Sequence, residues 1–209
     1  MKKSGVLRAA ASLLLALSLL FCLVPTAYAA YIPEFMDPGL CRGEPLTEEE
    51  QKENQRLIAA FLREELDLPD SAVAAILANI HRESSFNPRA IDDTEGFFGL
   101  LQWSRSRWVN CFHFCRKNNL DRFSVEGQMA FLKNELEGEY EWIYRDYLYP
   151  AEISEDGAQE AQYAFCQFFE APTELDWEQV RRSKLVAEIY WPLVWEGELA
   201  LPEQPLGED

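Results

Sequence analysis

The sequence has few of the residues that metal centres and nucleic-acid-binding surfaces need. Among its 209 residues there are only 2 histidines, and no pair of cysteines has the Cys-x-x-Cys spacing of a zinc site. Lysine and arginine are also scarce, since 19 of them stand against 36 aspartates and glutamates, and the formal net charge is −17. Binding to a phosphate backbone requires a basic surface. We therefore expect no metal or other cofactor and no nucleic-acid partner.

Long apolar runs are missing too, apart from one near the N-terminus at residues 9–24. Three basic residues precede this run and a small-residue sequence ending at Ala29 follows it, which is the pattern of a secretory signal peptide over residues 1–29. The run is shorter than the roughly 20 apolar residues of a membrane-spanning helix, although an uncleaved anchor stays open as an alternative. We predict a secreted or extracytoplasmic protein whose net charge falls from −17 to about −20 when the three leader charges are removed.

The cysteines are few but even in number once the signal peptide is removed. Four remain: Cys41, Cys111, Cys115 and Cys166. In an exported protein an even count favours disulfides over metal binding or catalysis. Cys111 and Cys115 are one helical turn apart, where a mutual bridge has awkward geometry. We predict that Cys41 pairs with one of them and Cys166 with the other.

Helical patterns account for most of the remaining chain, which shows no internal repeat. Residues 30–46 form a lead-in, residues 47–197 hold the periodic apolar residues of a single domain, and residues 198–209 form an acidic tail that we expect to be disordered. A short β-hairpin is expected in the irregular stretch that ends at Trp103, so the predicted fold class is mainly α with one small irregular or β-hairpin element. The spacing predicts helices over Thr47–Leu66 (opened by a Thr47…Glu50 capping box), from an N-cap at Asp70 or Ser71 to just past Glu83, and over Arg107–Asn118, Ser124–Glu137, Ser154–Phe169 and Trp177–Trp191.

The helix that ends near Glu83 carries the most informative side chain. Apolar residues recur at helical spacing up to Ile80, and Glu83 continues their stripe in the last turn, before Pro88 forces the chain out of the helix. An anion at a helix C-terminus is disfavoured by the dipole, and partial burial disfavours it further. Both effects raise the pKa of the carboxyl, as a general acid working near neutral pH requires. The alternative is a surface glutamate paired with Arg82 or Arg89.

The residues around this glutamate resemble the signature of the lysozyme-like superfamily. Goose-type lysozymes and lytic transglycosylases carry a similar Glu-Ser pair and Gly-Leu-x-Gln turn, which here read Glu83-Ser84-x-Phe86-x-Pro88-x-Ala90 and Gly96-x-x-Gly99-Leu100-Leu101-Gln102. The closer resemblance is to the phage tail lysozyme family, and it covers roughly Thr47 to Trp195. Its further matching positions are Ala78-Asn79, Gln102-Trp103, Arg105 or Arg107, Gln128…Phe131-Leu132…Glu135-Leu136, Phe169-Glu170-x-Pro172, and Arg181 or Arg182.

The resemblance implies a mainly α, lysozyme-like α+β domain in which the hairpin flanks a sugar-binding cleft. Glu83 would protonate the glycosidic oxygen of the β-1,4 bond between N-acetylmuramic acid and N-acetylglucosamine in peptidoglycan. Ser84 would support this glutamate or the substrate, and Trp103, which directly follows the turn, would border the substrate. The substrate-binding residues expected on this basis are Ser84, Phe98, Gly99, Gln102 and Trp103.

The sequence leaves the second catalytic group open. A hydrolase uses a second carboxylate, whereas a lytic transglycosylase can reuse its one acid as the base. The acidic loop offers three candidates by proximity alone, Asp92, Asp93 and Glu95, although a solvated loop residue is the better explanation for each of them taken singly. The family resemblance favours a muramidase over a lytic transglycosylase.

Two functions without catalysis as the main task are also compatible with the sequence. One is a wall-binding module that kept the fold. The other is an accessory component of a secretion, conjugation or phage-like machine, for which the acidity and the lack of a separate wall-binding domain are the indications. We expect a monomer in the cell wall whose partners are the glycan strands of peptidoglycan and, for the second alternative, such a machine.

Overall fold

Helix α4 (Asp70–Ser84) is buried at ten of its fifteen residues, and other helices pack around it. The computed structural model describes residues 44–92 and 96–199, which belong to one of the two units of the chain, Pro38–Asp209. The sequence predicted a single apolar stripe on this helix, but burial continues from Ser71 through Ile80 because small alanines fill the remaining positions. A helix that is apolar all round belongs in the middle of a domain. Its N-cap is Pro69 and not the predicted Asp70 or Ser71, and no side chain caps it.

Helix α3 (Glu48–Leu66) packs against α4 and confirms the predicted capping box. The backbone N–H of Glu50 donates to Oγ1 of Thr47 at 3.2 Å, and the backbone N–H of Thr47 donates to Oε2 of Glu50 at 2.8 Å. These bonds satisfy two of the donors that a helix start leaves without partners. The helix ends at Leu66, and its C-cap Asp67 adopts a left-handed conformation with φ of 49°.

The other predicted helices are present, with two differences at the C-terminal end. The expected helix from Ser154 to Phe169 ends in a π-helical turn, and so does the one that starts near Trp177. The last helical run also continues past Pro192, because Pro192 lies at the second position of a new helix, where the missing N–H leaves no intrahelical bond unmade. The elements are α5 (Arg105–Asn118), α6 (Val125–Leu136), α7 (Glu141–Ile143), η2 (Tyr144–Leu148), α8 (Glu155–Phe165), η3 (Cys166–Glu170), α9 (Leu175–Leu185), η4 (Val186–Tyr190) and α10 (Trp191–Trp195).

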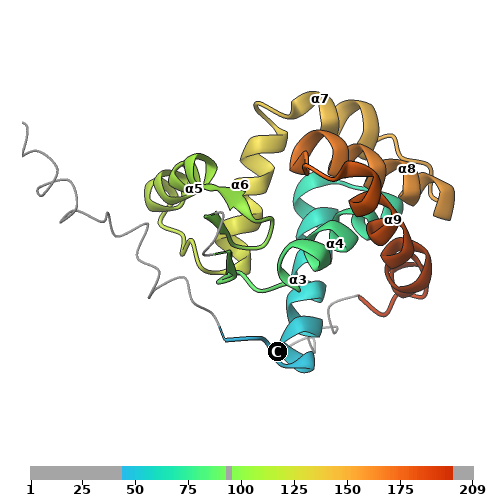
Figure 1. The fold of residues 1–209 in the computed structure, drawn as a ribbon, viewed down its shortest axis with the longest axis horizontal. Helices are drawn as coiled ribbons and strands as arrows, with labels where there is room; N and C mark the ends of the chain where they lie inside the picture. The colour runs from blue at the N-terminus through green and yellow to red at the C-terminus, as the bar shows by residue number, and fades with distance from the viewer. Residues whose placement is uncertain (1–43, 93–95, 200–209) are drawn as a thin grey trace, which may run out of the picture. The chain divides into compact units, whose positions relative to one another are not determined.

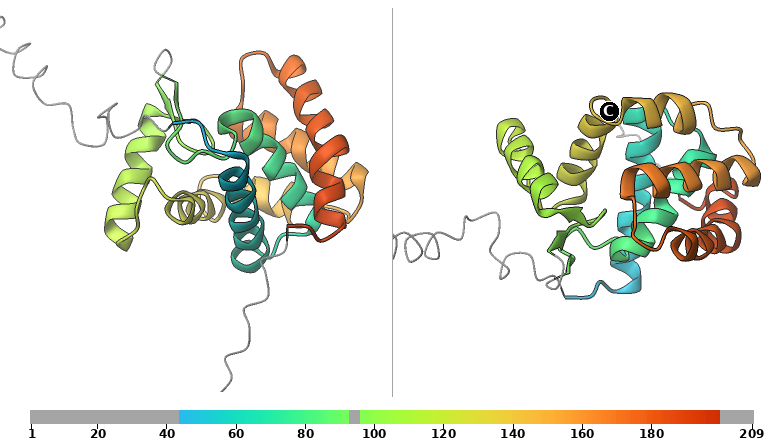
Figure 2. Two further views of the ribbon diagram at one scale, coloured as in Figure 1. Left: turned by 90° about the horizontal axis from the view of Figure 1, so that it is seen from below. Right: turned by 45° about the horizontal axis from the view of Figure 1, so that its top comes forward.

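The helices form two groups on either side of α3 and α4. Helices α5 and α6 lie beside each other on one side, and α8 and α9 cover the other side (Figures 1 and 2). Among the described elements α4 makes its most extensive contact with α8. The C-terminal end of α4 therefore lies between the two groups of helices.

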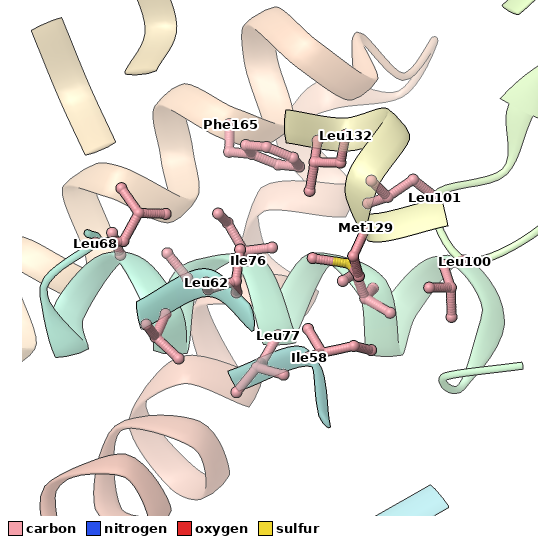
Figure 3. Close-up of a cluster of buried hydrophobic side chains, with 14 of the residues drawn as sticks. Ile58, Leu62, Leu68, Ile76, Leu77, Leu100, Leu101, Met129, Leu132 and Phe165 are labelled. Carbon is pink, nitrogen blue, oxygen red and sulfur yellow. The ribbon is translucent and has the colours of Figure 1, made fainter. Parts of the chain in front are cut away.

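The core is a continuous set of aliphatic and aromatic side chains that joins the two groups. Figure 3 shows it as a layer contributed mainly by α3, α4, α6 and α8, together with Leu100 and Leu101. Burying each large side chain of this kind stabilises the fold by about 1.5–3 kcal/mol. The labelled members are Ile58, Leu62, Leu68, Ile76, Leu77, Leu100, Leu101, Met129, Leu132 and Phe165.

A small antiparallel sheet stands where the sequence predicted a hairpin. Its strands β1 (Ile91–Asp92), β2 (Phe97–Phe98) and β3 (Trp103–Ser104) lie in the order β1-β2-β3. Phe98 pairs with both Ile91 and Trp103, whereas Phe97 pairs with Asp92 and Ser104. Because side chains alternate between the faces of a sheet, these two sets point in opposite directions.

The ends of the predicted domain are only partly described. The predicted signal peptide and most of the lead-in lie outside the described residues, as do residues 200–209 of the predicted tail. Leu199, which was predicted to belong to the disordered tail, is 4% exposed and packs with the core. The folded segment therefore extends at least to this residue. None of the helices in residues 44–92 and 96–199 has the length and apolarity to cross a membrane.

Candidate active site

A cleft of about 650 Å³ opens at the C-terminal end of α4. The sheet contributes one part of its wall, and the end of η3 with the start of α9 contributes another. Elements that are far apart in the sequence thus meet at the last turn of the buried helix. The lining residues are Arg82, Glu83, Asp92, Phe97, Gln102, Glu170, Ala171, Pro172, Thr173, Glu174, Glu178 and Arg182.

Glu83 lies in the last turn of α4 and faces this cleft, as the sequence predicted. Its side chain is 20% exposed and forms an ion pair with Nη2 of Arg182. Burial raises the pKa of Glu83, and this effect outweighs the attraction of Arg182 and Arg82, which lowers it. The direction agrees with that expected from the sequence. A carboxyl in such a position can hold a proton near neutral pH.

The ion pair of Glu83 is not one that the sequence suggested. Its partner is neither Arg82 nor Arg89 but Arg182, which comes from α9 and has a side chain only 1% exposed. Arg182 also pairs with Glu178, and Nη2 of Arg82 donates to Oε1 of Glu178 at 2.8 Å. Although burial raises the pKa of Glu178, the two arginines outweigh it and the pKa is lowered. Glu178 therefore stays ionised and competes with Glu83 for Arg182.

Glu170 is a second cleft carboxyl, and reasoning from the sequence did not assign it a role. It is the last residue of η3, and the chain turns directly after it at Ala171, which has a left-handed φ of 49°. Its Oε1 is shielded from solvent and has no hydrogen-bond partner among the described residues. Burial, reinforced by the charge of Glu83, raises the pKa of Glu170 well above its ordinary range. The only signal in the sequence was the Phe169-Glu170-x-Pro172 match.

Phe98 and Trp103 lie in the core and not in the cleft, which corrects the prediction that both bind substrate. Trp103 has no exposed surface, and Phe98 is 4% exposed and stacks on Trp108 at 5.6 Å between ring centroids. The reason is the alternation along β2 and β3, because the face that carries these two rings is turned inward. The opposite face presents Phe97 and Asp92 to the cleft. Phe97 is therefore the aromatic residue of the sheet that lines the cleft, in place of the predicted Phe98 and Trp103.

The indole of Trp103 belongs to a buried polar network. Its Nε1–H donates to Oε2 of Glu135 at 2.9 Å, and Glu135 also accepts hydrogen bonds from Nε and Nη2 of Arg107 at 2.8 and 2.9 Å. Nη1 of Arg107 donates to the carbonyl of Phe169 at 3.3 Å, and the guanidinium lies 4.3 Å from the centre of that ring. The network thus joins the sheet to the residue that precedes Glu170.

The turn between β2 and β3 is held by residues that the sequence grouped with the substrate site. Gly99 has φ of +74°, and a Cβ atom there would lie 2.5 Å from Oε1 of Gln128. That oxygen accepts a hydrogen bond from the backbone N–H of Leu100 at 2.8 Å, and Oγ of Ser84 donates to the carbonyl of Leu100 at 2.8 Å. Ser84 and Gly99 shape the turn, therefore, and do not line the cleft. Gln102 does line it, while its Nε2 donates to the carbonyl of Gly99 at 2.9 Å.

Of the three loop carboxylates predicted as candidates, the structure describes only Asp92. Asp92 lies on β1 and lines the cleft, which is compatible with a role beside Glu83. Asp93 and Glu95 lie outside the described residues. Across residues 44–92 and 96–199 no group of three or more His, Cys, Asp or Glu side chains is placed to hold a metal ion.

The predicted disulfides are not present in the part of the chain that the structure describes. Cys111, Cys115 and Cys166 are buried free thiols, and Cys41 lies outside the described residues. Sγ of Cys111 and Sγ of Cys115 are 3.9 Å apart on α5. Cys166 pairs with neither of them because it lies on η3 among the charged groups of the cleft, where burial raises its pKa to about 11.

A mainly helical domain with a small antiparallel sheet beside the glutamate-bearing end of a buried helix is a lysozyme-like protein. The model of the phage tail lysozyme family matches residues 53–192, which is more than half of the chain, and the protein belongs to that family. A comparison with curated proteins finds no match.

Proposed function

We propose that this protein is a peptidoglycan glycosidase, a muramidase that hydrolyses the β-1,4 bond between N-acetylmuramic acid and N-acetylglucosamine with Glu83 as the general acid. The observation that carries the proposal is the position of Glu83, a half-buried carboxyl with a raised pKa that faces the cleft in a member of the phage tail lysozyme family. Proton donation to the leaving oxygen is the step for which glycosidases need such a group.

The charged neighbours of Glu83 suit this role. When its carboxyl gives a proton to the glycosidic oxygen and the C1–O bond breaks, the carboxylate that remains is stabilised by Arg182. Before that step the negative charge of Glu178 offsets part of the attraction between Arg182 and Glu83, which helps Glu83 to keep its proton. Gln102 and Phe97 supply a polar and an aromatic surface for sugar rings.

Export follows from this substrate, since peptidoglycan lies outside the cytoplasmic membrane. The proposed signal peptide over residues 1–29 would deliver the protein to the cell wall. Delivery by a secretion, conjugation or phage-like machine is compatible with the same catalytic activity.

The test is digestion of purified peptidoglycan by the wild-type protein and by Glu83→Gln, with the released fragments analysed by mass spectrometry. The amide has the shape of the carboxyl but cannot donate the proton, so the release of fragments should fall by about two orders of magnitude or more. Glu160→Gln, which changes an exposed glutamate on α8, is the matched control and should digest like the wild type.

The products separate the alternatives. Reducing-end muropeptides from the wild type support the muramidase, and fragments lighter by one water identify a lytic transglycosylase. No release from several wall types by the wild type contradicts the glycosidase and leaves a wall-binding or accessory protein. Full activity in Glu83→Gln contradicts the mechanism.

A further inference from the structure

The cleft contains one partly buried carboxyl, Glu170, that takes no part in the ion pairs of the cleft arginines Arg82 and Arg182. Glu83 and Glu178 both form ion pairs with Arg182, and Glu178 also pairs with Arg82. Glu170 forms no ion pair with these arginines, and its Oε1 is shielded from solvent without a hydrogen-bond partner among the described residues. Buried polar atoms are nearly always paired, and an unpaired one that lines a cleft indicates a functional group.

The position of Glu170 is held by dedicated contacts. Arg107 binds the backbone carbonyl of the preceding Phe169 and stacks on its ring, and Arg107 is itself fixed by both oxygens of Glu135. The segment is a π-helical turn, and it ends in the left-handed Ala171. Such turns often occur at functional sites. Glu170 is therefore set rigidly at the cleft.

We propose that Glu170 is the second catalytic carboxyl of this cleft, the general base that accepts a proton from the water molecule attacking the anomeric carbon. The proposal rests on the proposed function, because it assigns the second half of the same hydrolysis.

The reaction balances with one proton shared by the two carboxyls. The proton of Glu83 goes to the glycosidic oxygen as the C1–O bond breaks, the oxygen of water bonds to C1, and one proton of that water goes to Glu170. One water is consumed and the pair ends with its proton on Glu170 instead of Glu83. Exchange with solvent returns the proton to Glu83 for the next turnover.

The two carboxyls lie in one cleft but in different surroundings. Glu83 forms an ion pair with Arg182, whereas Oε1 of Glu170 is shielded from solvent. The charged and titratable groups that act on Glu170 are Glu83, Arg107, Arg182 and Glu135, and together with burial they leave its pKa raised. Two interacting carboxyls of this kind titrate as a pair, and the proton that they share can lie on either of them.

Asp92 is the competing candidate, since it also lines the cleft. Asp92 is exposed on the edge strand β1, whereas Oε1 of Glu170 is shielded from solvent. Glu170 therefore has both the shielded oxygen and the rigid placement that suit a catalytic carboxyl. The test below compares the two residues directly.

The first measurement is peptidoglycan digestion by Glu170→Gln, with Glu160→Gln as the control on the neighbouring helix. We expect Glu170→Gln to fold, to keep its binding to insoluble peptidoglycan, and to lose at least about 100-fold in digestion rate. A folded Glu170→Gln variant with near-wild-type activity overturns the assignment, and if Glu83→Gln is inactive in the same assay the proposed function still stands. An inactive wild type overturns both.

The second measurement separates a catalytic role from a structural one. Azide needs no general base, so adding it to Glu170→Ala should restore bond cleavage and yield a glycosyl azide, in which azide nitrogen replaces water oxygen on C1. If the alanine variant does not fold, Glu170→Ser leaves similar space. Rescue supports the assignment. Failure of rescue in the folded small variant, or rescue of Asp92→Ala in its place, overturns it.

Discussion

Arg107 and Arg182 are surrounded by carboxylates in different ways. Arg107 is held by both oxygens of a single partner, Glu135, and its Nη1 donates to the backbone carbonyl of Phe169. Arg182 divides its donors between Glu83 and Glu178, and its Nε, although shielded from solvent, has no hydrogen-bond partner among the described residues. We call the Arg107 network closed, because it contains a single carboxylate, and the Arg182 network shared, because two carboxylates bind the same arginine.

The difference separates holding a structure from carrying out a reaction. A fully satisfied buried ion pair has one stable arrangement and resists any change of charge. A cation shared by two carboxylates lets one of them take up or release a proton while the other remains paired. The closed network lies behind the segment that ends in Glu170, and the shared one lies at Glu83, so each serves one of the two cleft carboxyls.

The largest effect on stability is expected from Arg107→Met. The variant leaves the charge of the buried Glu135 with only the Trp103 indole as a partner and frees the carbonyl of Phe169, so the free energy of unfolding should fall by about 3 kcal/mol. Urea denaturation followed by circular dichroism measures it. Arg145→Met, which breaks ion pairs of a largely exposed arginine, is the control and should change the urea midpoint little. If Arg107→Met and Arg145→Met lowered the urea midpoint equally, the Arg107 network would not have the structural role described above.

Arg182→Met should act on the reaction instead. Without this cation the carboxylate form of Glu83 loses its stabilisation, so the pKa of Glu83 rises further and the basic limb of the rate-versus-pH curve should move to higher pH. The rate at the optimum should fall because the anion left after proton transfer is less stable. Digestion rates across pH measure both effects. A basic limb at the wild-type position would show that Arg182 does not tune Glu83.

A smaller effect is expected in the pH dependence of stability. The pKa of Glu170 is raised in the folded protein, so this carboxyl favours the fold at pH values below its unfolded pKa of about 4.3, and the contribution is lost as the pH rises through the folded-state pKa. Glutamine cannot ionise. Glu170→Gln should therefore match the wild type in Tm at pH 4 and exceed it increasingly as the pH rises. Parallel Tm curves would show that Glu170 is ionised at no cost in the fold.

Local signals in the sequence predicted the helices and the principal carboxyl. The capping box at Thr47 involves residues three apart, and the apolar run before Glu83 lies within one helix, so both could be recognised without knowing the fold. The irregular stretch that ends at Trp103 predicted a hairpin, and the family resemblance added the cleft beside it. Reasoning from spacing alone would not have placed the cleft.

The remaining features depend on pairings that the sequence does not encode locally. Arg182 and Glu83 form an ion pair although they are 99 positions apart in the sequence, and no local pattern around either residue predicts this pairing. Each strand of the sheet has only two residues, so there is no alternation long enough to tell that Phe97 faces the cleft and Phe98 the core. Glu170 appeared as one letter of a motif, because its burial results from the packing of η3 against distant residues.

The smallest effect calibrates the comparison of the two arginines. Thr47→Ala removes an exposed helix cap far along the chain from both networks, and caps of this kind contribute about 1 kcal/mol to the free energy of unfolding. The urea midpoint should fall accordingly, Thr47→Ser should restore most of it, and the digestion rate and its pH profile should be unchanged at temperatures where both proteins are folded. If Thr47→Ala instead moved the pH profile as Arg182→Met does, a loss of stability alone would suffice to alter the reaction. The shift at Arg182 would then no longer identify that residue as the one that tunes Glu83.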